Sequence, residues 1–546
     1  MNREIENDPS SGTNNSLTPT TIDQAVRIAA ATNPDILALA DAPNRETFFA
    51  GSPQRLTWAE VDRAVGSLAS SLEKLGAGPN APVAIQLPNM VELVVTILAC
   101  ARLGTVAVPF PVQHRSHELR HGLGLSKAAL MVTGARPDRP DQLEMMAAII
   151  AEQGRPLTLA TFGPDTIDGA TPLTLDLAGG GEPTRGATPG PDEVVTVCWT
   201  SGTTGTPKGV PRSNAMWLAS GSFQVDELAL TNQDRILCPF PVVNMAGIGG
   251  MLVPWAIAGA ALHLHQPMDL NVFLQQLVGE QITYTVAPPP LLNMLLANEA
   301  MLDGVDLSNV RMISSGSAPL DPWMVEGWDQ RGIEIVNVFG SNEGAAMLST
   351  KAMVPDATQR ARYFPRPERE GVEVRLVDLD SGDEITEPGR LGELRFRGIT
   401  VFEGYLDSSG EEFDDEGYYR TGDLFEWVDD ATPPQLLRFV DRAKDIIIRG
   451  GVNISAAEVE GLVASHETVA ECAAIAFPDT NLGERLGVFV VAAEGGEPTL
   501  EAITAHLREL DVASYKLPER IEIIEALPRN PVGKVTKPNL RQRWQG

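Results

Sequence analysis

Residues 200–210 read Thr-Ser-Gly-Thr-Thr-Gly-Thr-Pro-Lys-Gly-Val and follow a strand-like run, Glu-Val-Val-Thr-Val-Cys-Trp, at 193–199. The pattern predicts a loop that leaves the end of a sheet. Its glycines let the backbone turn sharply and bring N–H groups close to a ligand, while its hydroxyls and its lysine add donors and positive charge. A loop with these properties fits the phosphates of a nucleotide. The residues concerned are Thr200, Ser201, Gly202, Thr203, Thr204, Gly205 and Lys208.

Two other interpretations of this loop are weaker. It is not a Walker A loop, because Lys208 is followed by Gly209 instead of Ser or Thr and the glycine spacing differs. A surface turn rich in glycine and threonine is the plainer alternative, but the length of the run argues against it. We therefore expect a nucleotide site here.

The composition limits the class of protein. The chain has 546 residues, enough for several domains, and 43% of them are hydrophobic, as in a soluble globular protein. Its formal net charge of −30 argues against sequence-independent nucleic-acid binding, which needs a basic surface. The four cysteines lie far apart without a Cys-x-x-Cys pair, which indicates free thiols in a reducing compartment and no zinc site.

The sequence does not predict membrane insertion. The first residues, Met-Asn-Arg-Glu-Ile-Glu-Asn-Asp-Pro, carry acid and no apolar core, so we expect no signal peptide. The longest apolar run, 248–264, is broken by Pro254 and is short for a membrane span, so we expect a buried helix followed by a strand. We predict no transmembrane segment and a cytoplasmic location.

Alternating strands and helices indicate the fold class. Apolar segments at 82–87 and 105–109 are typical of buried strands, and residues 92–103 between them are predicted to form a helix. Thr57 and Glu60 have the spacing of a capping box at the start of another helix. Such units predict an α/β protein with a parallel sheet, in which ligands bind at the carboxyl ends of the strands.

The loop at 200–210 resembles the phosphate-binding signature of the adenylate-forming (ANL) superfamily, which includes acyl-CoA synthetases, aryl-CoA ligases, firefly luciferase and peptide-synthetase adenylation domains. Further matches run from about Leu56 to Lys534. The resemblance implies a large N-terminal domain of αβ-layered sheets plus a β-subdomain, and a small mobile α+β C-terminal domain. We expect a disordered tail at 1–20, the adenylation domain at 21–441, a hinge at 442–445 and the mobile domain at 446–546.

Three segments resemble the superfamily's nucleotide-binding motifs. Residues 310–320 run as a strand into a turn like the one against which adenine packs, and residues 339–343, Phe-Gly-Ser-Asn-Glu, resemble Tyr-Gly-x-Thr-Glu. Residues 418–424 match the Tyr-Arg-Thr-Gly-Asp motif, whose carboxylate can accept both ribose hydroxyls of ATP. The nucleotide contacts implied by the resemblance are Gly316, Ser317, Ala318, Asn337, Phe339, Gly340, Asn342, Asp423 and Arg442.

The second motif departs from the superfamily pattern at two positions. Phe339 replaces Tyr but keeps an aromatic face for the purine, and Asn342 replaces Thr but can still donate to the α-phosphate. The resemblance makes Glu343 a ligand of Mg²⁺, with Thr204 as a second ligand, in keeping with the preference of this cation for oxygen.

The C-terminal segments imply the second half of the site. Residues 441–445 resemble the superfamily's hinge, which puts Lys444 at the pivot and Arg442 near the ribose or phosphate. In relatives, the turn that corresponds to Gly450 and Gly451 approaches the pantetheine tunnel of coenzyme A. Residues 528–537 match the loop that carries the catalytic lysine, here Lys534.

Residues 240–247 resemble the segment that lines the acyl pocket, although Asn244 stands where relatives often have His or an aromatic residue. The small residues that follow either leave room for a ligand or allow tight helix packing, and the sequence makes the two equally good explanations. The predicted acyl pocket consists of Asn244, Met245, Ala246, Gly250 and Ser315.

Together the motifs imply a reaction that uses ATP, Mg²⁺, coenzyme A and a small-molecule carboxylic acid. The carboxylate attacks the α-phosphate to give acyl-AMP and pyrophosphate, with Lys208, Glu343 and Lys534 as catalytic residues, and a thiol then attacks the acyl-AMP carbonyl. We expect an acid–CoA ligase that acts on a cyclic, aromatic, branched or medium-chain acid. The alternatives are an acyl-AMP ligase that loads a carrier protein, a light-emitting relative, and a nucleotide-binding pseudoenzyme or regulator. A homodimer is possible.

Overall fold

The computed structural model describes residues 18–79, 81–179, 181–184, 189–200, 207–443, 445–449, 452–479, 482–510, 512, 514–529 and 535–544. Several predicted site residues therefore lie outside the described residues, namely Ser201, Gly202, Thr203, Thr204, Gly205, Lys444, Gly450, Gly451 and Lys534. Most of the expected tail at 1–20 lies outside them as well. Its last residues are described, and the N–H of Thr20 donates to Oε1 of Gln24 at 2.8 Å, so ordered contacts begin before residue 21.

The first sheet carries the loop at 200–210. It has the strand order β7-β6-β5-β3-β4-β8-β9, and its neighbours are parallel except for the antiparallel pair β8–β9. The predicted strand–helix–strand unit is confirmed as β3, α3 and β4. The strands are β3 (Val83–Ile85), β4 (Ala107–Pro109), β5 (Leu130–Gly134), β6 (Thr158–Phe162), β7 (Ala170–Pro172), β8 (Val194–Thr200) and β9 (Lys208–Ser213).

The second sheet has eight strands in the order β15-β14-β13-β12-β10-β11-β1-β2. Its strands are β1 (Leu37–Ala40), β2 (Arg55–Thr57), β10 (Arg235–Cys238), β11 (Ala261–Leu264), β12 (Tyr284–Val286), β13 (Met312–Gly316), β14 (Glu334–Gly340) and β15 (Ala346–Ser349). The apolar run at 248–264 forms the end of the π-helix η2 (Met245–Leu252), helix α7 (Val253–Ala258) and β11, which confirms the predicted buried helix and strand. No helix among the described residues is long and apolar enough to cross a membrane.

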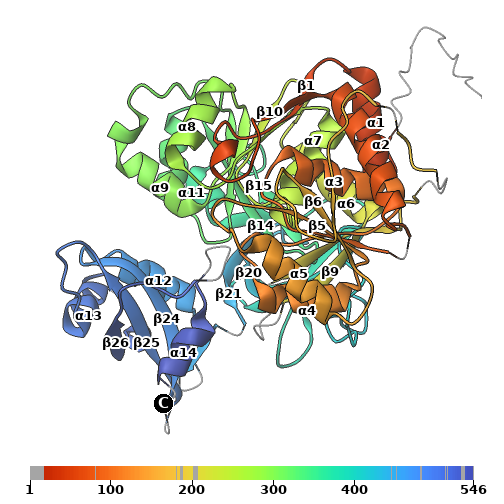
Figure 1. Cartoon of the computed structure of the whole chain (residues 1–546). Coiled ribbons are helices and arrows are strands. Elements are labelled where there is room, and N and C mark those ends of the chain that lie inside the picture. Colours follow the sequence, from red (N-terminus) through yellow and green to blue (C-terminus); the bar gives the residue numbers. More distant parts are fainter. Residues whose placement is uncertain are drawn as a thin grey trace, which may run out of the picture.

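Helices cover both sheets (Figure 1). The predicted capping box is present at the start of α2, where the N–H of Glu60 donates to Oγ1 of Thr57 and the N–H of Thr57 donates back to the Glu60 carboxylate. The helices of this domain are α1 (Ile22–Thr32), α2 (Trp58–Lys74), α3 (Val91–Leu103), α4 (Ser116–Ser126), α5 (Gln142–Glu152), α6 (Asn214–Glu227), α8 (Leu270–Gly279), α9 (Pro289–Ala297), α10 (Pro322–Gln330) and α11 (Ala357–Arg360).

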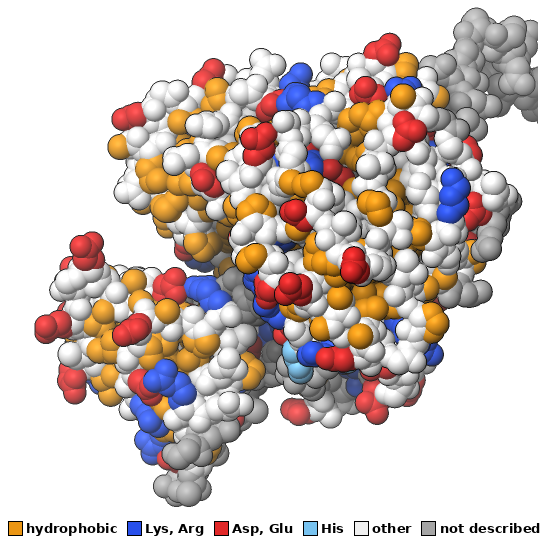
Figure 2. Space-filling view, viewed as in Figure 1, with side chains coloured by type: hydrophobic (Ala, Val, Ile, Leu, Met, Phe, Trp, Pro, Cys, Tyr) orange, Lys and Arg blue, Asp and Glu red, His pale blue; other side chains and the backbone are white. Residues whose placement is uncertain are grey.

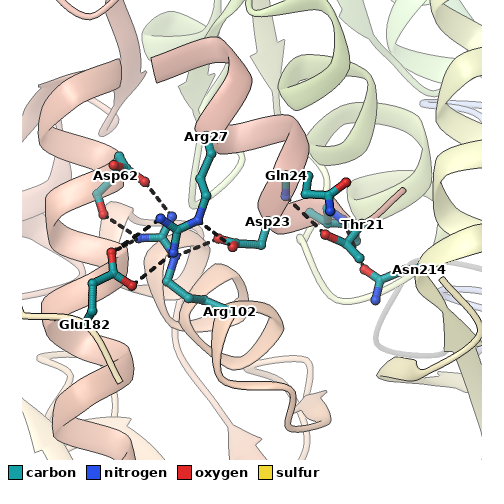
Figure 3. Close-up of polar contacts among 9 residues, drawn as sticks. Thr21, Asp23, Gln24, Arg27, Asp62, Arg102, Glu182 and Asn214 are labelled. Carbon is teal, nitrogen blue, oxygen red and sulfur yellow. Dashed lines mark hydrogen bonds and ion pairs between the residues drawn. The ribbon is translucent and has the colours of Figure 1, made fainter. Parts of the chain in front are cut away.

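A buried arginine connects the N-terminal helices (Figure 3). The side chain of Arg102 on α3 is 1% exposed, and its guanidinium contacts Asp23 of α1 at 2.6 Å and Asp62 of α2 at 2.5 Å. Glu182 reaches the same guanidinium at 3.6 Å and also pairs with Arg27. Because a buried charge needs a partner, these ion pairs fix α1 against α2 and α3.

The β-subdomain is a six-stranded sheet in the order β16-β21-β20-β19-β17-β18. Its hydrogen-bonded neighbours are all antiparallel. Its strands are β16 (Tyr363–Pro365), β17 (Val372–Val377), β18 (Glu384–Ile385), β19 (Gly392–Gly398), β20 (Tyr419–Trp427) and β21 (Leu436–Arg442). The last strand ends at the predicted hinge.

The C-terminal domain stands beside the larger domain (Figure 1). Its sheet is built from β22 (Ile447–Arg449), β23 (Val452–Ile454), β24 (Val469–Asp479), β25 (Gly483–Ala492) and β26 (Arg520–Ile523), with helices α12 (Ala456–Ala464), α13 (Leu500–Glu509) and α14 (Lys537–Trp544). It has an apolar core of its own, which includes Val459, Leu486 and Ile503. The predicted fold class, a large layered α/β domain followed by a small α+β domain, is confirmed. Figure 2 shows acidic side chains spread over both domains, in keeping with the net charge of −30.

Candidate active site

One cavity of about 1510 Å³ lies where the carboxyl ends of β12, β13 and β14 face the β-subdomain. This is the edge at which a parallel sheet binds ligands. Fifteen of the predicted site residues line it: Thr200, Lys208, Asn244, Met245, Ala246, Gly250, Ser315, Gly316, Ser317, Phe339, Gly340, Asn342, Glu343, Asp423 and Arg442.

Glu343 and Lys208 both contact the side chain of Tyr405. The carboxylate of Glu343 is 7% exposed, and its Oε1 accepts a hydrogen bond of 2.8 Å from the phenol of Tyr405. The ammonium of Lys208 lies 4.4 Å from the centroid of the same ring. Burial and the nearby Glu343 raise the pKa of Tyr405, so the phenol keeps its proton and remains a donor.

Tyr405 is a residue of the site that was not predicted from the sequence. It lies 62 residues from Glu343 in the chain, after β19, and only the packing of the β-subdomain on the second sheet brings the two together. Its sequence context, Gly404-Tyr405 after a strand, was the available signal.

The side chain of Asn342 holds the turn after β14 to two other elements. The amide oxygen of Asn342 accepts from the N–H of Met245 at 2.8 Å, and its amide nitrogen donates to the carbonyl of Trp199 at 3.1 Å. An amide NH₂ has two hydrogens, so one remains for the predicted contact with a phosphate. Asn342 therefore ties the turn to β8 and to η2.

Arg212 is a second residue that the sequence did not reveal. It is fully buried, and burial lowers the pKa of its guanidinium to about 10. Nη1 donates to the backbone carbonyl of Asn342 at 3.4 Å, and Nη2 donates to Oγ of Ser220 at 3.2 Å. The guanidinium lies 4.6 Å from the ring centroid of Trp217. Through its hydrogen bond to the carbonyl of Asn342, Arg212 holds the Asn342–Glu343 turn in place.

The base end of the cavity is formed by β13 and β14. At Gly316 a Cβ would come within 2.1 Å of the Val338 carbonyl, so the two backbones approach as only glycine allows. Ser317 follows with φ +68°, a left-handed conformation that turns the chain after β13. The half-buried ring of Phe339 packs edge-on against Phe425 at 5.1 Å.

Asn337 and Ala318 are not brought together with the other predicted residues. Asn337 is 4% exposed, and its amide donates to the carbonyls of Arg360 at 3.0 Å and Ala361 at 3.1 Å. Both amide hydrogens are therefore used to hold the end of α11 against β14. Ala318 is exposed in the turn after β13, and neither residue lines the cavity.

Asp423 and Arg442 face each other at the opposite wall. They are register partners on β20 and β21, and Nε of Arg442 lies 3.3 Å from Oδ1 of Asp423. Asp423 is 7% exposed, whereas the side chain of Arg442 is 39% exposed. A carboxylate fixed in this way can accept two hydroxyls of a ribose.

The sequence left two explanations for the small residues at 244–250, room for a ligand and tight helix packing, and the structure distinguishes them. Asn244 is the N-cap of η2, and its Oδ1 accepts from the N–H of Gly247 at 3.1 Å. A Cβ at Gly247 would lie 2.1 Å from the Pro241 carbonyl, so Gly247 serves packing. At Gly250 the nearest atom to such a Cβ is Nε2 of Gln224 at 3.7 Å, so Gly250 leaves space in the cavity. Both explanations hold, at different positions.

Among the described residues no group of three or more His, Cys, Asp and Glu side chains could hold a metal ion. A single buried carboxylate, Glu343, fits a Mg²⁺ that arrives with the phosphates of ATP, because this cation keeps most of its ligands from water and phosphate.

Comparison with known proteins identifies the family. The AMP-binding enzyme family matches residues 26–406, and the AMP-binding enzyme C-terminal domain matches residues 458–534. An indoleacetate–CoA ligase of Aromatoleum aromaticum is 32% identical, with 90% of this chain and 94% of that protein covered. A medium-chain fatty-acid–CoA ligase of Escherichia coli is also 32% identical, with 89% and 85% covered.

A solved structure shares the fold. ATP-bound MatB from Rhodopseudomonas palustris superposes with a TM-score of 0.81 at 24% identity, over 97% of this chain and 99% of that one. The family matches and the two relatives confirm the sequence resemblance to the adenylate-forming superfamily. The chain belongs to the AMP-binding enzyme family, within the adenylate-forming superfamily of acid–CoA ligases.

Proposed function

We propose that this protein is an ATP-dependent ligase that joins a cyclic, aromatic, branched or medium-chain carboxylic acid to coenzyme A through an acyl-AMP intermediate. The observation that carries the proposal is that Lys208, Glu343 and Asp423 line one cavity together with a largely apolar compartment at η2. Two relatives are ligases named for indoleacetate and for medium-chain fatty acids, and the apolar parts of such acids would suit this compartment.

In the first step, a carboxylate oxygen of the acid attacks the α-phosphorus of Mg²⁺–ATP, a P–O bond forms, and the bond to pyrophosphate breaks. The protein contributes position and charge in such a reaction. Glu343 contacts the Mg²⁺ of the substrate, Lys208 neutralises the departing pyrophosphate, and Asp423 accepts the ribose hydroxyls. Lys534, outside the described residues, is proposed to bridge the carboxylate and the α-phosphate.

In the second step, the thiol of coenzyme A attacks the carbonyl carbon of acyl-AMP, a thioester forms, and AMP leaves. We propose that a rotation about Lys444 exchanges Lys534 for the turn at Gly450 and Gly451 between the two steps. The domain boundaries at 441 and 446 and the role of Lys444 remain proposals. The homodimer and the cytoplasmic location stay predictions as well.

The alternative of a nucleotide-binding pseudoenzyme or regulator rests on the departures at Asn244, Phe339 and Asn342. Each of these residues has a local structural role: Asn244 caps η2, Phe339 packs on Phe425, and Asn342 ties three segments together. These structural roles account for the three departures without invoking a change of function, and this supports the ligase over a nucleotide-binding regulator.

The decisive experiment is coenzyme A-dependent AMP formation across a panel of acids, with Lys534→Ala as the comparison. AMP release that depends on the acid and on coenzyme A, and that is lost in Lys534→Ala, would support the ligase. Pyrophosphate release without turnover of coenzyme A would instead identify a carrier-loading enzyme. Nucleotide binding without turnover of any acid would favour the regulator.

A further inference from the structure

One face of helix α6 lines the cavity from Ser220 to Glu227. Ser220, Phe223, Gln224 and Glu227 all line the cavity, and their spacing of three and four residues puts them on one side of the helix. The row begins at Ser220, beside the Arg212 that supports the Asn342–Glu343 turn. It ends at Glu227, about 10 Å further along the helix axis. The cavity therefore extends from the phosphate region to the C-terminal end of α6.

Apolar side chains line the cavity from two further elements. Met245 and Met251 line it from η2, and Met347 and Leu348 line it from β15. Methionine side chains are unbranched and adaptable, so such a compartment accommodates hydrocarbon of varied shape. An acid whose carboxylate lies at the Asn342–Glu343 turn would extend its hydrocarbon part along this compartment toward Glu227.

Arg369, from the connection between β16 and β17, lines the same cavity next to Glu227. Nη2 of Arg369 donates to Oε1 of Glu227 at 2.6 Å, and Nη1 donates to Oδ2 of Asp226 at 2.9 Å. The guanidinium also lies 4.6 Å from the ring centroid of Phe223. Arg369 thus bridges two segments 142 residues apart, both of which line the cavity.

We propose that Arg369, held by Glu227 and Asp226, forms the end wall of the acyl compartment and sets the greatest length of acid that the enzyme accepts. The inference rests on the proposed function, because it assigns the compartment along α6 to the acyl group. The side chains of Arg369 and Glu227 are 25% and 26% exposed, so most of the ion pair is shielded from solvent. Acids that fit inside it are accepted, and longer ones must displace the ion pair.

The test compares straight-chain saturated acids of increasing length in the wild type and in Arg369→Ala. Each methylene that becomes buried improves binding about fourfold, so access for two or three more should raise relative activity on longer acids more than tenfold. We expect the activity of the wild type to fall steeply for acids beyond a medium chain length. In Arg369→Ala this fall should occur at a longer chain length. Glu227→Gln should move it in the same direction by a smaller amount.

The matched control is Arg390→Ala. Arg390 forms one ion pair with Asp378 in the β-subdomain, its side chain is 50% exposed, and it does not line the cavity. Arg390→Ala removes the same positive charge as Arg369→Ala, but at a position away from the cavity. The dependence of activity on acid length should therefore equal that of the wild type. Partly exposed ion pairs contribute little to folding, and the melting temperatures of both variants should stay close to the wild-type value.

Binding of the same acids, measured by calorimetry without ATP, separates this inference from the proposed function. If acids bind with a length limit that shifts in Arg369→Ala but no AMP forms, the end wall stands and the ligase proposal falls. An identical length profile in the wild type and Arg369→Ala, in activity and in binding, would overturn the end wall. So would the absence of any binding by these acids.

Discussion

The phenol of Tyr405 donates a 2.8 Å hydrogen bond to Oε1 of Glu343, across 62 residues of chain. Glu343 is the carboxylate proposed to meet Mg²⁺–ATP, and Lys208 lies over the same tyrosine ring. One side chain of the β-subdomain thus positions both charged groups at the phosphate end of the cavity. We propose on this basis that Tyr405 is a positioning residue for the proposed first step of the reaction.

Tyr405→Phe should lower the rate of pyrophosphate release about tenfold, because it removes one hydrogen bond to a charged group while the ring beside Lys208 remains. The apparent KM for Mg²⁺–ATP should rise with it. Steady-state kinetics at varied Mg²⁺–ATP measures both. Tyr515→Phe in the C-terminal domain is the control, and equal kinetics in the two variants would remove Tyr405 from the site.

Gly344→Ala should abolish activity and destabilise the fold by about 3 kcal/mol or more. Gly344 has φ +99°, and a Cβ there would lie 1.8 Å from the carbonyl oxygen of Thr400 and 2.2 Å from Nη1 of Arg212. Gly382→Ala is a matched control: φ is +78° and no atom lies within 4 Å, so it should cost only about 1 kcal/mol. Urea denaturation of both variants gives the comparison. Similar costs would show that the turn relaxes around the added methyl group.

Ala246→Trp should reduce activity on the largest acids first and spare the smallest. Ala246 lines the cavity on η2, where an indole would occupy space next to Met245. The measurement is kcat/KM across acids of graded size. A uniform loss across the series would mean that residue 246 does not border the acyl group.

Stability should fall as the pH drops from about 6.5 toward 4, in part through His263. Burial lowers the pKa of this side chain to about 4, against a weaker upward effect of Glu280, whose Oε2 lies 3.4 Å from Nδ1. Below pH 6.5 the unfolded chain binds a proton that the folded state rejects, so unfolding becomes easier by up to about 3 kcal/mol.

Thermal unfolding at pH 7 and pH 5 tests this assignment with His263→Leu. The variant should lose less stability than the wild type between the two values. His506→Leu in the C-terminal domain should behave as the wild type does. Equal losses in all three proteins would assign the pH dependence to other groups.

The sequence by itself determined the elements whose causes are local. The capping box of Thr57 and Glu60, the strands β3 and β4, and the helix–strand pair within 248–264 follow from caps and from the spacing of apolar residues a few positions apart. Most of the described residues that it predicted for the site do line the cavity, because the motifs that resemble the superfamily are short and contiguous.

Tertiary structure decided every contact between distant segments. Tyr405 reaches Glu343 only after the β-subdomain packs on the second sheet, and Arg369 reaches Glu227 only across the cavity. Asn337 was predicted to contact nucleotide, but α11 packs beside β14 and its carbonyls take both amide hydrogens. Local periodicity specifies which face of an element is buried, whereas the choice of partner depends on residues more than a hundred positions away in some of these contacts.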